Sequence, residues 1–204
     1  MNHLAHAWLA RHSDAGILGA MLGDFAHGPV DALPWPPAVR AEIRRHRHID
    51  RLTDTHPATL AARALFPEGR RRFAGIVLDV HFDHLLARDW ARWNVAPDDA
   101  PLDAFAARVY RVLLDRFDAL PPRLQAIAPR MAAHDWLGGM RSRASVDGTV
   151  RSIARRLSRG GDLLVACLDD LRTHADDIEA AFGAYFPALI AATAATRDGS
   201  GAGR

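Results

Sequence analysis

The sequence of 204 residues predicts an all-α fold, a single compact multi-helix bundle. Apolar residues recur at helical spacing from one end of the chain to the other, whereas alternating runs of β-branched residues are almost absent. Prolines and short glycine-containing stretches divide the chain, as expected for loops between helices. No internal repeat or domain linker is visible, so we expect one domain over 1–196 and a disordered tail over 197–204.

The ends of the expected helices follow from caps and prolines. Ser13 is a good N-cap for the second helix, Pro37 lies near the first turn of the third, and Pro57 opens a short fourth helix. Ser145 is the expected cap of the eighth helix, and the last long segment is expected to be one helix that is bent or split at Pro187. The predicted helices span about 2–10, 14–26, 37–55, 57–65, 68–92, 102–118, 122–137, 145–158 and 162–195.

The composition excludes several classes of protein. The single cysteine, Cys167, rules out an internal disulfide framework and a cysteine-based zinc site, and it suits a reducing cytoplasm. The N-terminal stretch has histidines inside its apolar part, unlike a signal peptide, and no uncharged apolar run reaches the roughly 20 residues that span a bilayer. The formal net charge of +2 gives no argument for nucleic acid. We therefore expect a cytoplasmic protein with no membrane span and no nucleic-acid partner.

Acidic residues occupy the apolar side of the helix predicted over 68–92. Each helical residue advances about 100° around the axis, so Asp83 lies about 40° from Asp79, in the middle of an apolar arc that includes Val80. Burying an unpaired carboxylate costs several kcal/mol, and buried carboxylates are therefore normally paired or bound to a metal. His84 lies at the rim of this arc, whereas His81 lies nearly opposite Asp79 and is expected to be solvated.

Two earlier helices repeat this pattern. His46 and Asp50 are four residues apart and share a face with Ile43, so that face is expected to point toward the core. Asp24 lies in line with Ile17 and Met21 on the helix predicted over 14–26, which predicts a further inward-facing acid. His6 lies on an apolar helix at the N-terminus. Imidazole and carboxylate groups from several helices suit Mn²⁺ or Mg²⁺ better than a structural zinc.

The competing interpretation is structural. A single inward aspartate is more often a helix-cap partner or half of an ion pair, and the chain has 26 arginines and no lysine. Four of these arginines fall within about 60° of one another on the third predicted helix, beside the row of His46 and Asp50. They are Arg40, Arg44, Arg47 and Arg51. This stripe is either a solvated helix face or a surface that stabilises phosphate charge or holds an acidic partner.

Four stretches, in this order, resemble motifs of the acyl carrier protein phosphodiesterase (ACP hydrolase) family: "MNHLAHAWLA", "LGDFAHG", "HRHIDRLTD" and "LDVHFDHLLARDW". The resemblance covers nearly the whole chain. Two departures are His3, where an aromatic residue is usual, and His48, where arginine is common, and we expect both to lie outside the metal cluster. The family is similar to the all-helical HD-type metal phosphohydrolases, with a divergent motif, so an HD-domain-like bundle is implied.

The resemblance implies a phosphoric diester hydrolase that cleaves 4′-phosphopantetheine from a serine of holo acyl carrier protein. The products would be apo carrier protein and 4′-phosphopantetheine, and Mn²⁺ or Mg²⁺ would be required to activate water. Carrier proteins are small and acidic, which gives the arginine stripe a role. Two alternatives stay open: an HD-type phosphohydrolase acting on a small phosphoester or nucleotide, and a non-enzymatic helical adaptor whose acids form structural ion pairs.

Family motif and helix geometry together nominate the site residues. The expected metal ligands are Asp24, His46, Asp50, Asp79 and Asp83. Asp83, His84 and His6 are the expected catalytic groups, as ligands or in proton transfer. Thr53 and Asp54 are expected to orient the ligands, and Arg40, Arg44, Arg47 and Arg51 to contact the substrate, with Arg47 on the phosphate.

Overall fold

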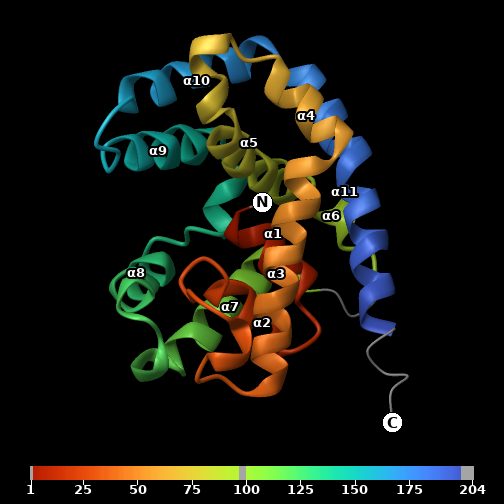
Figure 1. Cartoon of the computed structure of the whole chain (residues 1–204), viewed down its shortest axis with the longest axis vertical. Coiled ribbons are helices and arrows are strands. Elements are labelled where there is room, and N and C mark those ends of the chain that lie inside the picture. The colour runs from red at the N-terminus through yellow and green to blue at the C-terminus, as the bar shows by residue number, and fades with distance from the viewer. Residues whose placement is uncertain (1, 97–99, 199–204) are drawn as a thin grey trace.

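The structure, a computed structural model, describes residues 2–96 and 100–198, the last four of them by their backbone alone. All regular elements in these ranges are helical, which confirms the predicted all-α fold (Figure 1). The α-helices are α1 (His3–Leu9), α2 (Asp14–Leu22), α3 (Pro37–Thr55), α4 (Pro57–Ala64), α5 (Glu68–Arg88), α6 (Trp90–Trp93), α7 (Leu102–Leu114), α8 (Pro122–Ala133), α9 (Arg143–Ala154), α10 (Gly161–Thr173) and α11 (Ala175–Asp198). Three 3₁₀-helices join them: η1 (Val30–Ala32), η2 (Phe117–Ala119) and η3 (Gly138–Arg141).

The cap at Ser13 and the helix starts at two prolines are as predicted. The Ser13 hydroxyl accepts a hydrogen bond from the Gly16 amide at 3.0 Å, which satisfies one of the free donors in the first turn of α2. Pro37 and Pro57 are the first residues of α3 and α4, where the missing N–H costs no hydrogen bond.

The C-terminal half departs from the predicted boundaries. The segment expected as one helix is divided at His174, and α11 continues through Pro187 without a break. Buried Phe186 and Leu189 flank this exposed proline, and their packing holds the helix together across it. Helix α9 begins at Arg143, before the predicted cap at Ser145. The predicted tail over 197–204 lies outside the described residues except for 197–198, which end α11.

Helix α5 is the central element of the bundle. It packs against α1, α4, α9, α10 and η3, while α2 packs against α1, α3 and α7, so that α1 lies between α5 and α2 (Figure 1). Large apolar side chains such as Trp8 and Phe82 are fully buried there, and each contributes about 1.5–3 kcal/mol through burial. Because neighbours cover α5 on several sides, His81 is 3% exposed, and the prediction that it is solvated was wrong.

Within the described ranges, no helix is both long enough and apolar enough to cross a lipid bilayer.

Candidate metal centre

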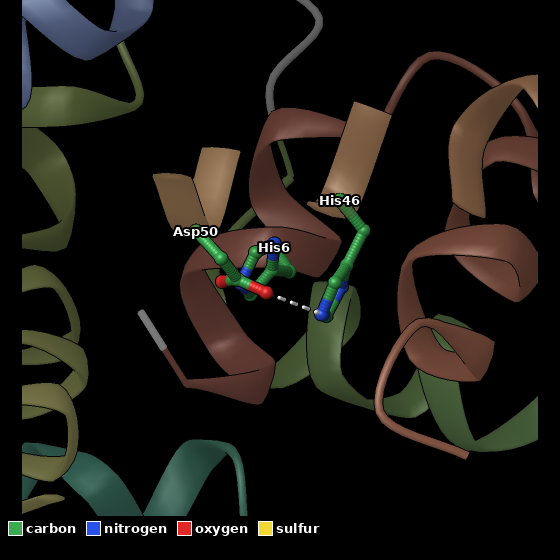
Figure 2. Close-up of side chains that lie close together, drawn as sticks. All are labelled: His6, His46 and Asp50. Atoms are coloured by element: carbon green, nitrogen blue, oxygen red, sulfur yellow. Dashed lines mark hydrogen bonds and ion pairs between the residues drawn. The ribbon is translucent and has the colours of Figure 1, made fainter. Parts of the chain in front are cut away.

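Helices α1 and α3 bring the side chains of His6, His46 and Asp50 together (Figure 2). One ligand atom from each lies within 4.8 Å of the others. The Asp50 carboxylate lies 3.0 Å from His6 Nε2 through one oxygen and 3.3 Å from His46 Nε2 through the other. The two imidazole rings are stacked, with their centroids 3.7 Å apart. The helical i,i+4 spacing on α3 therefore meets a histidine of α1, and these three residues form the central cluster.

Asp24 extends the central cluster on the side of α2. One of its oxygens lies 3.4 Å from His46 Nε2, and the other lies 3.4 Å from His3 Nδ1. The side chain of Asp24 is 46% exposed and that of Asp50 is 40% exposed, whereas His6 and His46 are buried. Asp24 is thus at the solvent edge and not inside the core as predicted, because it follows the last turn of α2. The site has buried imidazoles and an open carboxylate side.

His46 is held in the tautomer that a metal ligand needs. Its Nδ1 lies 2.8 Å from the Ala20 carbonyl oxygen and donates to it, so in the neutral imidazole the lone pair is on Nε2. Nε2 is buried and faces both carboxylates at ion-pair distance, 3.4 Å from Asp24 and 3.3 Å from Asp50. An imidazole nitrogen that faces two carboxylates is an arrangement in which a divalent cation would take the place of the proton between them, so this nitrogen fits a ligand position.

The charges of the site are strongly coupled. Burial favours neutral His46, but the carboxylates of Asp24 and Asp50 outweigh it and raise the pKa of His46 to about 9. Against the effect of burial, His46 lowers the pKa of Asp24 to about 2, and the pKa of Asp50 is lowered as well. Burial lowers the pKa of His6 to about 4. No arginine of the described chain pairs with Asp24 or Asp50, so the competing interpretation, a structural ion pair with a guanidinium, does not account for these two acids.

Gly23 makes room for the His46 ring. A Cβ atom at this position would lie 2.1 Å from His46 Cγ, so any side chain must push the imidazole away. We expect Gly23→Ala to weaken Mn²⁺ binding by at least about tenfold, the lower scale for a disturbed metal-ligand shell. Gly183→Ala is the matched control, because its added Cβ would meet no atom within 4 Å. Titration of Mn²⁺ measures both variants, and equal affinities would show that the ring position does not matter.

Asp83 contacts the backbone of α1 and is not part of the central cluster. Its two oxygens accept hydrogen bonds from the amides of Leu4 at 2.8 Å and Ala5 at 3.0 Å. The N-cap residue Asn2 makes no side-chain cap bond within the described structure, so this distant carboxylate completes the first turn of α1. Burial raises the pKa of Asp83 to about 7 in spite of these amides. Asp83 therefore positions the helix that carries His6, and a ligand role for it remains a prediction.

The other predicted acids and Thr53 do not belong to the group of ligand atoms formed by His6, His46 and Asp50 among the described residues. Asp79 is half-buried one turn before Asp83, and burial raises its pKa, with a further contribution from the negative charge of Asp50. Asp54 is exposed and pairs with Arg63 at 3.2 Å. The hydroxyl of Thr53 donates to the carbonyl of Ile49 at 2.8 Å and shares a hydrogen bond with the hydroxyl of Tyr185.

His84 is separated from the central cluster. Its Nδ1 lies 2.7 Å from the Met140 carbonyl oxygen, which ties α5 to η3. The ring neighbours His81 at a centroid distance of 5.4 Å. Neither residue belongs to the group of ligand atoms formed by His6, His46 and Asp50 among the described residues. The catalytic role predicted for His84 therefore has no support from this geometry and stays a prediction.

The arginine stripe of α3 covers the loop that follows α2. Arg40 donates to the Asp31 carbonyl at 3.3 Å, and Arg44 forms an ion pair with the Asp31 carboxylate. Arg47, predicted to contact phosphate, donates to two loop carbonyls, including that of Gly28 at 2.9 Å. Arg51 is exposed. Three of the four guanidinium groups thus hold a loop in place.

The sequence interpretation missed His3. It was expected outside the cluster, yet its Nδ1 reaches Asp24 and its ring stacks near Phe25 at a centroid distance of 6.1 Å. The sequence contains a signal for this position of His3: His3 and His6 are three residues apart and therefore share a face of α1.

The fold and the cluster define an all-α protein with a buried imidazole–carboxylate centre, built from α1, α3 and the end of α2 and open on its carboxylate side. Residues 1–189 match the family described as "Acyl carrier protein phosphodiesterase", and the chain belongs to this family. Relatives named acyl carrier protein phosphodiesterase from Salmonella dublin, Salmonella agona and Salmonella newport are each 34% identical over 194 residues, covering 95% of this chain and 98% of theirs. No solved structure matches the chain significantly.

Proposed function

We propose that the chain hydrolyses the phosphodiester bond between 4′-phosphopantetheine and a serine of holo acyl carrier protein. The products are apo carrier protein and free 4′-phosphopantetheine. The observation that carries this proposal is the cluster of His6, His46 and Asp50 in a chain that matches the family along nearly its whole length. The single buried thiol of Cys167 and the carrier-protein substrate support a cytoplasmic location.

We further propose that the centre holds Mn²⁺ or Mg²⁺ through His6, His46, Asp50 and Asp24. Two imidazoles and two carboxylates match the preference of these cations for oxygen with some nitrogen, and Nε2 of His46, which faces the carboxylates of Asp24 and Asp50, supports a ligand position. When bound, such a cation lowers the pKa of a coordinated water and polarises a phosphoryl oxygen.

The protein groups around the centre have separate tasks in this proposal. The Ala20 carbonyl fixes the proton of His46 on Nδ1, and Asp83 fixes the start of α1 and with it His6. The half-exposed carboxylates of Asp24 and Asp50 form the open side of the centre, where a phosphodiester can approach. Burial raises the pKa of Asp79, a half-buried carboxyl one turn before Asp83, and this makes it a candidate to exchange a proton with the departing serine.

The test is incubation of holo carrier protein with the purified protein, with and without Mn²⁺ and a chelator. We expect a change in the gel mobility of the carrier protein, and release of 4′-phosphopantetheine confirmed by mass spectrometry, only when Mn²⁺ is present. Release that continues unchanged after exhaustive chelation would contradict the metal proposal. The absence of release under every condition, with a correctly folded protein, would contradict the proposed reaction.

A further inference from the structure

Five arginines on α9 and in the loop that follows it form an exposed basic surface. They are Arg143, Arg151, Arg155, Arg156 and Arg159, here called the α9 arginine face. The stretch 143–160 contains one acidic residue, Asp147, and its carboxylate is already paired with Arg172 of α10. The α9 arginine face therefore carries a local excess of positive charge on a chain with a formal net charge of +2.

These guanidinium groups are not used within the described part of the chain. None of the five makes a side-chain hydrogen bond or ion pair with another described residue, and all are exposed. Several arginines elsewhere are bound: Arg44 to Asp31, Arg88 to Asp89 and Glu179, and Arg108 to Asp14. Exposed arginines before and on α8 also lack such partners among the described residues, but they do not adjoin the cavity between η3 and α9. An arginine without an internal partner keeps its planar set of donors for carboxylates or phosphates of another molecule.

A cavity of about 290 Å³ adjoins the α9 arginine face between η3 and α9. Trp136 and Met140 give it an apolar part, while Thr149, Ser152 and Arg156 give it hydroxyl and guanidinium groups. A cavity beside a basic surface offers an anchoring point for one apolar side chain of a partner whose surrounding surface is acidic.

The α9 arginine face is connected to the catalytic elements by packing. Helix α9 packs against α5 and η3, and α5 packs against α1 (Figure 1).

We propose that the α9 arginine face is the docking surface for the acidic carrier protein, with one apolar side chain of the carrier in the cavity of Trp136 and Met140. This inference rests on the proposed function for the identity of the partner. Charge complementarity favours it over the stripe on α3, because Arg40, Arg44 and Arg47 are occupied by the loop before α3 whereas the α9 guanidinium groups are free of described partners.

The test compares two triple variants that remove the same charge. Arg151→Gln, Arg155→Gln and Arg159→Gln together remove part of the α9 arginine face, while Arg116→Gln, Arg123→Gln and Arg130→Gln together change exposed arginines before and on α8. The dissociation constant of fluorescently labelled holo carrier protein is measured by anisotropy at several salt concentrations. For each protein, KM and kcat for the carrier protein and the rate with bis(p-nitrophenyl) phosphate are measured as well.

We expect the α9 variant to raise the dissociation constant and KM by about tenfold and to flatten their dependence on salt, with kcat and the small-diester rate unchanged. The α8 variant should behave like the unmodified protein. An unchanged dissociation constant in the α9 variant, or an equal change in the α8 variant, would overturn the docking surface. Tight, salt-dependent binding by the unmodified protein without release of phosphopantetheine would contradict the proposed reaction and leave the docking result to stand by itself.

Discussion

His46→Gln is expected to reduce the release of phosphopantetheine by more than about a hundredfold, since even outer-shell partners of a metal site have effects of that size. The Nε2 lone pair of His46 lies between the carboxylates of Asp24 and Asp50, and the glutamine amide does not offer a nitrogen lone pair there. His48→Gln is the matched control, because this half-buried histidine of the same helix lies outside the cluster. Turnover of His46→Gln at the rate of the control would contradict the proposed centre.

The pH dependence of Mn²⁺ binding provides a second measurement on the same variant. In the metal-free protein the pKa of His46 is raised from 6.5 to about 9, so its stabilising ion pairs are fully present below pH 6.5 and are lost as the pH rises through 9. Mn²⁺ must displace that proton, so its apparent affinity should rise by up to about tenfold per pH unit toward pH 9. The Mn²⁺-induced increase in Tm should therefore grow between pH 7 and 9, and His46→Gln should lose this growth.

The part of the centre that could be predicted is the part encoded within single helices. His46 and Asp50 share a face of α3 because four residues are close to one helical turn, and this relation holds whatever the helix packs against. Asp24 was found by the same argument. The exposure of the Asp24 side chain could not be predicted in this way, because a position at the end of α2 depends on the path of the following loop.

Contacts between distant segments could not be predicted from spacing. The partners of Asp83 are amides 79 and 78 residues away, and the partner of Arg44 is an aspartate in a proline-rich loop. The chain is divided between α10 and α11 at His174, where no proline or glycine predicts a helix end. Pro187 does predict a helix end, but it lies inside α11, where buried neighbours keep the helix continuous. At Pro187, tertiary packing overrode the local preference of proline for a helix end.

Asp83→Ala is expected to destabilise the protein and to disorder the start of α1. The buried amides of Leu4 and Ala5 would lose their acceptor, at a cost of about 1–3 kcal/mol for each amide left unsatisfied. Asp83→Asn keeps one carbonyl oxygen and should fall between Asp83→Ala and the unmodified protein. Urea denaturation measures the free energy of unfolding, and hydrogen exchange of the α1 amides reports the local effect. Unchanged stability and unchanged exchange in Asp83→Ala would contradict the positioning role.

The same two variants separate a positioning role of Asp83 from the ligand role that its sequence motif predicted. If Asp83 acts through α1, Mn²⁺ affinity and turnover should fall in proportion to the lost protection of the α1 amides, and Asp83→Asn should recover part of each. Because burial raises the pKa of Asp83 from 3.8 to about 7, the folded state holds a proton there that the unfolded state has lost, so this group lowers stability as the pH rises from 4 to 7. Asp83→Asn should remove that slope. A loss of Mn²⁺ binding in Asp83→Asn with full protection of the α1 amides would instead make Asp83 a ligand, because only direct coordination would then connect the carboxylate to the metal.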